Sequence, residues 1–192
     1  RCLMINSFGH QTIRKTLETV PYRERKGPIK SLMTNDGKPK EKPPFAGEGY
    51  YFWEDNIEAA EWWGNVRYKR ESYRVFRIDL LLRYDDNSLF DLIGSRQHLK
   101  LLEKLVEKAR RNIDCKGWKL HNFISYFRKV EEHKPGAFPY KMIRFNDYNL
   151  NPKFQNYIQL SDNHSRFLMN PFYIVCVFDL AVVNLKSFIF IK

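Results

Sequence analysis

The sequence is poor in cysteine, and it has no hydrophobic run long enough to cross a membrane. Its three cysteines, Cys2, Cys115 and Cys176, are odd in number and widely spaced. That pattern fits neither a disulfide framework nor a zinc site, and it favours a reducing compartment. The apolar runs stay well short of the ~20 residues of a membrane span, and no signal-peptide pattern is seen. We therefore expect a cytoplasmic protein with no membrane partner.

Metal ligands and acidic residues are scarce as well. The five histidines are scattered without a His-x-x-x-His pair, so we assign no metal. The chain has 22 acidic residues and 33 lysines and arginines, which gives a net charge of +11. No glutamate follows Glu132, and the only later acids are Asp147, Asp162 and Asp179. A chain this basic is drawn to polyanions: nucleic acids, nucleotides or acidic proteins.

The chain does have enough apolar and aromatic residues to build a core. Hydrophobic residues make up 43% of the 192 residues and aromatic residues 16%, which predicts a folded protein. The length predicts a single domain over residues 1–192. Because the chain begins at Arg1 rather than at Met, we expect a trimmed chain or a domain cut from a longer protein.

The most informative stretch runs from Phe45 to Arg67. Two glycines, Gly47 and Gly49, precede the aromatic run Tyr50–Trp53, and the acids that follow suit a helix N-terminus. The stretch therefore predicts a glycine turn, a buried strand and a capped helix. It separates Tyr51 on the strand from Trp62 on the helix by eleven residues, so a flat ring could lie between them. Both could equally be core aromatics.

The other elements follow from hydrophobic periodicity. Together they predict an α+β fold with a split, mainly antiparallel sheet, flanking helices and a cleft. The expected strands are Cys2–Phe8, Ser72–Leu82, Tyr140–Phe145, Tyr157–Leu160, Phe172–Phe178 and Leu185–Ile191, the last two joined as a hairpin over Asp179–Asn184; the expected helices are Ile13–Val20, Ser95–Arg111 and Trp118–Val130.

Residues 21–44 predict a basic, flexible surface loop. The segment holds seven lysines and arginines against three acids, with five prolines and two glycines. This composition cannot bury a core. Ile29, Leu32 and Met33 would anchor its middle. The loop would either cover a pyrophosphate or an anionic target, or be only a solvated loop.

Gly47-Glu48-Gly49-Tyr50-Tyr51-Phe52 resembles the second signature of the ADP-ribosyltransferases of the diphtheria-toxin and poly(ADP-ribose) polymerase type. Ala59-Ala60 stand at that signature's small-residue pair, although a serine is usual at the first position, and Trp62 stands at its second aromatic. The resemblance implies that Tyr51 and Trp62 stack on the two faces of the nicotinamide ring of NAD. Gly49 and Tyr50 would belong to the same NAD-binding strand.

His10-Gln11-Thr12 resembles the His-Gly-Thr signature on the first strand of the same family. The resemblance implies that the His10 side chain bonds the adenosine ribose of NAD, and that the backbone of the next residue holds the carboxamide. Gln11 departs from the family's glycine. Its side chain would therefore have to point away from the ring.

The family's catalytic glutamate has no counterpart in this chain. Phe154–Gln159 aligns best with that strand and puts Asn156 at the glutamate position, with Gln159 as a rival amide; a second alignment puts Phe172 there. An amide bonds a ribose hydroxyl but offers no charge to a developing cation. Tyr51, Asn156 and Gln159 are then the candidate catalytic residues. The resemblance implies single-unit transfer rather than polymer elongation.

We therefore expect a mono-ADP-ribosyltransferase that uses NAD, with a protein or a nucleic acid as acceptor. By analogy, a basic enzyme of this size would be a bacterial or phage toxin or a delivered effector. Two alternatives stay open: a catalytically silent module that binds NAD or ADP-ribose, and a basic nucleic-acid-binding protein with no NAD site.

Overall fold

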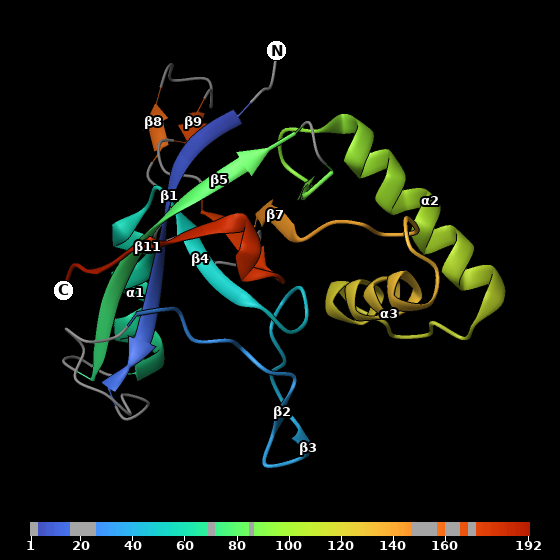
Figure 1. The fold of residues 1–192 in the computed structure, drawn as a ribbon, viewed down its shortest axis with the longest axis horizontal. Coiled ribbons are helices and arrows are strands. Elements are labelled where there is room, and N and C mark those ends of the chain that lie inside the picture. The colour runs from blue at the N-terminus through green and yellow to red at the C-terminus, as the bar shows by residue number, and fades with distance from the viewer. Residues whose placement is uncertain are drawn as a thin grey trace.

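Seven strands form one curled sheet in the order β11-β5-β1-β4-β10-β7-β6 (Figure 1). A computed structural model describes residues 4–15, 26–68, 72–84, 87–146, 157–159, 166–168 and 172–192. Among the described strand pairs of this sheet, only β6–β7 is parallel, so the expected α+β class with a mainly antiparallel sheet is confirmed. The strands are β1 Met4–Arg14, β4 Tyr50–Glu54, β5 Tyr73–Arg83, β6 Leu89–Asp91, β7 Met142–Asn146, β10 Tyr173–Val177 and β11 Val183–Phe190.

The two faces of the sheet bury different cores. One face packs under residues of α1 (Ile57–Tyr68), α2 (Arg96–Asn112) and α3 (Leu120–His133) and is rich in aromatic side chains. The buried members of the other core all come from the strands, which pack on one another where the sheet curls. Phe52 and Trp53 are neighbours on β4 yet belong to different cores, because successive strand residues face opposite sides.

Six of the expected elements are confirmed to within three residues at each end. Ser72–Leu82 corresponds to β5, Ser95–Arg111 to α2 and Trp118–Val130 to α3. Tyr140–Phe145 corresponds to β7, Phe172–Phe178 to β10 and Leu185–Ile191 to β11. Ser95 caps α2, since its hydroxyl accepts the His98 N–H at 3.2 Å. Among the described helices, none is both long and apolar enough to cross a membrane.

The first strand is longer than the sequence suggests. The prediction of a strand ending at Phe8 with a helix from Ile13 is wrong, because β1 continues to Arg14. It pairs with β5 over its whole length, from Met4 opposite Arg83 to Arg14 opposite Tyr73. This ladder outweighs the helical spacing of the apolar residues, and it places His10 in the middle of a strand rather than at its end. Residues 16–20 of the expected helix lie outside the described residues.

The hairpin expected over Asp179–Asn184 is also wrong. β10 already has β4 and β7 as its two neighbours, so it has no free edge for the next strand. A 3-10 helix, η4 (Leu180–Val182), turns the chain away instead, and Asp179 caps it by accepting the Ala181 N–H at 3.0 Å. β11 then pairs with β5 at the far edge of the sheet.

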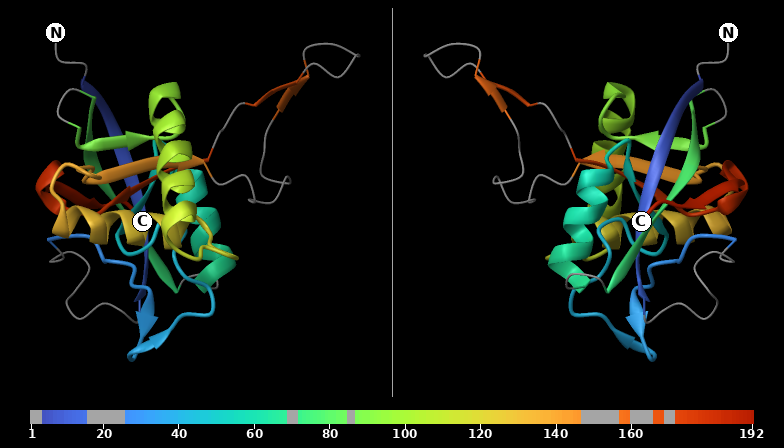
Figure 2. Two further views of the ribbon diagram at one scale, coloured as in Figure 1. Left: turned by 90° about the vertical axis from the view of Figure 1, so that its right-hand side faces the viewer. Right: turned by 90° about the vertical axis from the view of Figure 1, so that its left-hand side faces the viewer.

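The expected strand over Tyr157–Leu160 appears as β8 (Tyr157–Gln159), but it does not join the main sheet. β8 pairs with β9 (Arg166–Leu168) in a separate two-stranded sheet. Figure 2 shows this hairpin standing away from the seven strands. Gln159 is therefore not on a strand of the sheet that carries Tyr51.

A buried ionic network ties the three strands β4, β7 and β6 together. Arg144 on β7 donates to Glu54 on β4 at 2.6 Å and to Asp91 on β6 at 3.3 Å. Its guanidinium also lies 4.9 Å from the ring centre of Tyr173 on β10. Asp91 is fully buried and accepts hydrogen bonds from the Tyr84 hydroxyl and from two backbone N–H groups.

We expect Asp91→Asn to lose roughly 1–3 kcal/mol of unfolding free energy at pH 7, because it removes a charged acceptor from buried donors. Burial disfavours the charged form of Asp91, but bonds from Tyr84, Gly94 and Ile93, together with Arg144, hold its pKa below the ordinary value. A lowered carboxyl pKa contributes stability above the unfolded-state pKa, and that contribution is lost as the pH falls through the folded-state pKa. Urea unfolding between pH 7 and about pH 3 measures both effects. If the unfolding free energy of Asp91→Asn fell with pH just as that of the parent protein does, this account would be contradicted.

Candidate functional site

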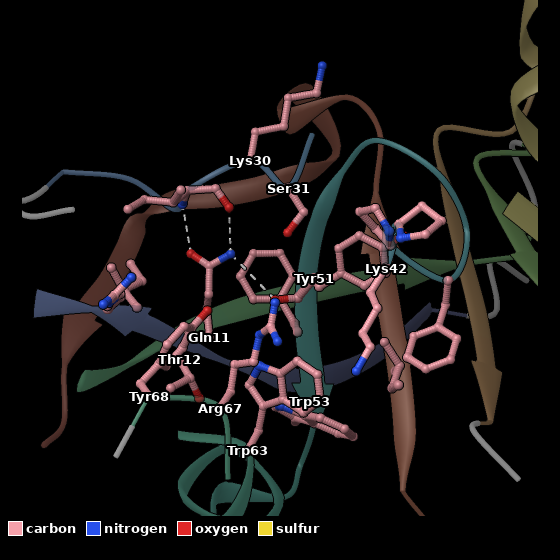
Figure 3. Close-up of a pocket in the computed structure, with 18 of the residues that line it drawn as sticks. Gln11, Thr12, Lys30, Ser31, Lys42, Tyr51, Trp53, Trp63, Arg67 and Tyr68 are labelled. Atoms are coloured by element: carbon pink, nitrogen blue, oxygen red, sulfur yellow. Dashed lines mark hydrogen bonds between the residues drawn. The ribbon is translucent and has the colours of Figure 1, made fainter. Parts of the chain in front are cut away.

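A pocket of about 430 Å³ opens beside β1, β4 and α1 (Figure 3). Aromatic rings and cations dominate its wall, and the lining residues that the structure describes include no carboxylate. The aromatic members are Phe45, Tyr51, Phe52, Trp53, Trp63 and Tyr68, and the basic members are Arg14, Lys30, Lys40, Lys42 and Arg67.

The pocket exists because two strands separate. β1 and β4 pair only at Gly9 with Glu54 and at His10 with Trp53. Beyond His10 the strands diverge, and Gln11, Thr12 and Tyr51 line the space between them. Gln11 is among the lining residues, and that its side chain points away from a bound nicotinamide ring stays a prediction. The Gln11 amide holds a neighbouring segment.

Tyr51 presents its ring to the pocket while its hydroxyl is bound by the protein. The hydroxyl donates to the Gly47 carbonyl at 2.6 Å and accepts the Ala46 N–H at 2.9 Å. Burial, together with nearby Cys176, raises the pKa of Tyr51 far above its ordinary value. The phenol therefore stays protonated near neutral pH. Tyr51 can stack on a ligand there, but it cannot act as a base.

The two glycines before β4 are required by backbone geometry and packing. Gly47 has a φ of +85°, which few other residues adopt. A Cβ on Gly49 would collide with Cys176 Sγ and would lie 2.9 Å from the Val177 carbonyl oxygen. The Gly-x-Gly spacing thus lets the chain enter β4 directly against β10, whether or not a ligand is bound.

Two adjacent tryptophans of α1 have different surroundings. Trp63 lines the pocket, with its ring centre 6.2 Å from that of Trp53. Trp62 is not among the described lining residues, and it packs on Trp53 at 6.3 Å and on Phe172 at 6.0 Å. Neighbouring helix residues are about 100° apart, so the two rings leave α1 in different directions, although their centres lie 6.3 Å apart. The α1 tryptophan that meets the pocket with Tyr51 is thus Trp63.

The basic segment is the stretch predicted as a loop over residues 21–44, and its described part, residues 26–44, forms one rim of the pocket. This part is not a free loop. Backbone bonds join Ser31 to Gly49 at 2.7 and 3.1 Å, and the Met33 N–H donates to Glu48 Oε1 at 3.1 Å. The strands β2 (Thr34–Asn35) and β3 (Lys38–Pro39) then form a short hairpin. Ile29 packs on the strand core as expected, whereas Leu32 is 45% exposed and anchors nothing.

His10 is buried beside the pocket rather than in its described lining. Burial lowers the pKa of His10, and the charge of Arg77 lowers it further, while a hydrogen bond with the Trp53 backbone opposes the shift. The imidazole is therefore neutral at pH 7. Its Nδ1 is buried with no hydrogen-bond partner in the described structure. Thr12 lines the pocket, and its hydroxyl donates to the Ala60 carbonyl at 2.6 Å, which ties β1 to α1.

The remaining predicted residues are not among the described lining residues of this pocket. Asn156 lies outside the described residues, and Gln159 lies on β8 in the separate hairpin. Gly49 and Tyr50 are not among the described lining residues, although they neighbour Tyr51. Within the described ranges, no group of three or more His, Cys, Asp or Glu side chains could hold a metal ion.

The five described cations of the pocket were not predicted individually from the sequence. Arg67 follows Trp63 by four residues on α1, so helical spacing alone puts both on one face. That signal was available in the sequence. Arg14 and Lys30 had no such signal, because their place depends on how β1 and the basic segment meet.

Comparison with family models, with curated proteins and with solved structures finds no match to this chain. The fold and the pocket therefore define the protein in structural terms. It is an α+β protein with a mainly antiparallel sheet, whose aromatic pocket is bordered by a lysine-bearing segment.

Proposed function

We propose that the pocket binds NAD and that the protein is a mono-ADP-ribosyltransferase. The observation that carries the proposal is the lining itself: aromatic rings beside five described cations and no described carboxylate. A dinucleotide has flat rings that stack on aromatics and a pyrophosphate that cations bind. The pocket volume of about 430 Å³ lies within the usual range of ligand sites.

Two parts of NAD have counterparts in the lining. Tyr51 and Trp63 would contact the nicotinamide ring, whose positive charge suits an aromatic face. Arg14, Lys30 and Arg67 would neutralise the pyrophosphate. The resemblance of Gly47–Phe52 and His10–Thr12 to ADP-ribosyltransferase signatures supports the same ligand. An ADP-ribosyltransferase-like arrangement of the sheet is part of this proposal.

Transfer would break the bond between the ribose C1′ and nicotinamide while a nucleophile of a protein or nucleic-acid acceptor attacks C1′. The transition state carries positive charge on the ribose. A carboxylate would stabilise that charge by a few kcal/mol, and the described lining has none. We therefore propose slow turnover, with Asn156 as the residue beside the ribose and Gln159 as its rival.

The same observation favours a second candidate, a module that binds NAD or ADP-ribose without turnover. Nicotinamide release separates the two candidates. If Asn156→Ala leaves a robust release rate unchanged, another group carries the step. If purified protein binds NAD but releases no nicotinamide, the binding module is the function.

We expect Trp63→Ala to weaken NAD binding by roughly 1–2 kcal/mol, about five- to thirty-fold, because one stacking face is lost. Calorimetric titration with NAD measures the change. Tyr51→Ala should have a similar or larger effect, since it also removes the bonds to Ala46 and Gly47.

Trp62→Ala is the matched control for Trp63→Ala. Its ring packs on Trp53 and Phe172, so its loss should lower the melting temperature. NAD affinity should fall less in Trp62→Ala than in Trp63→Ala. An NAD affinity that falls in Trp62→Ala but not in Trp63→Ala would return the stacking role to Trp62. No NAD binding by the parent protein would refute the proposed function.

A further inference from the structure

Gln11 makes a side-chain bridge to the basic segment at the point where β1 and β4 separate. Its Oε1 accepts the Ile29 N–H at 2.8 Å, and its Nε2 donates to the Ile29 carbonyl at 2.9 Å (Figure 3). The amide group thus reproduces the pair of bonds that a neighbouring strand would make. Gln11 is only 5% exposed, so no bulk water replaces these bonds.

Every second residue of the segment from Ile29 to Met33 is held by a hydrogen bond to another part of the chain. Ile29 is held by Gln11, Ser31 by the backbone of Gly49, and Met33 by the Glu48 carboxylate. Ile29, Lys30 and Ser31 all line the pocket, and Lys30 Nζ lies 3.7 Å from Glu48 Oε2.

The part of the segment that follows the β2–β3 turn is positioned through the same hydrogen bonds. The Lys40 N–H donates to the Met33 carbonyl at 2.9 Å, so the position of Lys40 follows that of Met33. Lys40 and Lys42 both line the pocket. Three of the five described cations of the lining therefore sit on a segment that Gln11 joins to β1.

We propose that Gln11 is a positioning residue that fixes Lys40 and Lys42 against the pocket, so that these lysines meet the phosphate groups of a nucleoside diphosphate ligand. The proposal rests on the proposed NAD function and assigns the lysines of the segment to its ADP-ribose half. An ordered cation gives up less freedom on binding than one on a free loop. Gln11 acts through the lysines.

Gln11→Met tests the role, because methionine has a similar length and cannot make either bond. We expect its affinity for ADP-ribose to fall about tenfold, and the salt dependence of that affinity to become weaker. Affinity for nicotinamide riboside, which carries no phosphate, should stay within about twofold, as followed by NMR titration. Hydrogen exchange at the Ile29 amide and tryptic cleavage after Lys30 and Lys40 should both accelerate; Lys38 and Lys42 precede proline and are not cleaved.

Ser187→Ala is the matched control. Ser187 also bridges two backbone groups, accepting the Asp79 N–H at 2.8 Å and donating to the Asn184 carbonyl at 2.7 Å, but on β11. It should change neither ligand affinity nor cleavage of the segment. A Gln11→Met variant with unchanged ADP-ribose affinity, or with equal losses for both ligands, would overturn the positioning role.

Failure of the proposed function gives a different result. If the parent binds ADP but not NAD, the NAD function fails, and the Gln11 role is judged by ADP affinity in Gln11→Met. If the parent binds none of NAD, ADP-ribose, ADP and inorganic pyrophosphate, both proposals are overturned.

Discussion

Replacing Arg144 by methionine should lower the free energy of unfolding by roughly 3–5 kcal/mol at pH 7, the largest loss that we expect from a single change. The guanidinium is the shared cation of two carboxylates, at 2.6 Å from Glu54 and 3.3 Å from Asp91. Methionine keeps the packing volume but leaves both carboxylates buried without their cation. Urea denaturation monitored by tryptophan fluorescence measures the loss.

The loss in Arg144→Met should shrink as the pH falls. Burial already raises the pKa of Glu54, despite the bond from Arg144, and removing the cation raises it further. A carboxyl group whose pKa is raised in the folded state destabilises the fold at high pH. This destabilisation disappears once the group is protonated. Arg144→Met is therefore expected to be least destabilised, relative to the parent, in mild acid.

Lys141→Met is the matched control for Arg144→Met. Lys141 pairs with Asp179 at 3.8 Å, but both side chains are about half exposed, so its loss should stay below about 1 kcal/mol. The double variant Glu54→Gln, Arg144→Met should recover part of the stability, because the amide carries no buried charge. Equal losses in Arg144→Met and Lys141→Met would show that the network contributes little.

Replacing Gly49 by alanine should cost roughly 3 kcal/mol, at the upper end of the usual range for overpacking. The new Cβ would collide with Cys176 Sγ and lie 2.9 Å from the Val177 carbonyl oxygen, which belongs to the central strand β10. A side chain can rotate away, but a strand carbonyl cannot move without disturbing its ladder. Because Gly49 also pairs with Ser31, NAD affinity should fall together with thermal stability.

The double variant Gly49→Ala, Cys176→Ala separates the two collisions. Removing Sγ relieves one contact and leaves the carbonyl contact, so the double variant should lose less than the sum of the single losses. Gly27→Ala is the control, since a Cβ there meets nothing within 4 Å. Strict additivity, or a neutral Gly49→Ala, would contradict the packing role of the glycine.

Elements with strong local signals were predicted well. Ser95 and the apolar spacing after it identified α2, and the apolar content of Tyr73–Arg83 identified β5. The Gly47-x-Gly49 run correctly predicted a turn, the strand β4 and the helix α1. These signals reside in neighbouring residues, so they can be read without knowing the fold.

Elements that depend on distant partners were not predicted. The length of β1 depends on β5, whose paired residues lie 59 (Arg14 to Tyr73) to 79 (Met4 to Arg83) positions further along the chain. The path from β10 to β11 depends on which edges of the sheet are already occupied. The Glu54–Arg144–Asp91 network joins residues from three strands, and no spacing in the sequence brings them together.

The sequence by itself determined the charge, the mainly antiparallel α+β class and the presence of Tyr51 and a neighbouring tryptophan in the strand–helix unit after Gly49. Only the tertiary structure decided that Trp63 rather than Trp62 lines the pocket, because the rotation of α1 is set by its packing on Trp53 and Phe172. It also decided that Gln11 anchors the basic segment. That role needs the gap between β1 and β4, and such a gap between paired strands arises only when the whole sheet is assembled.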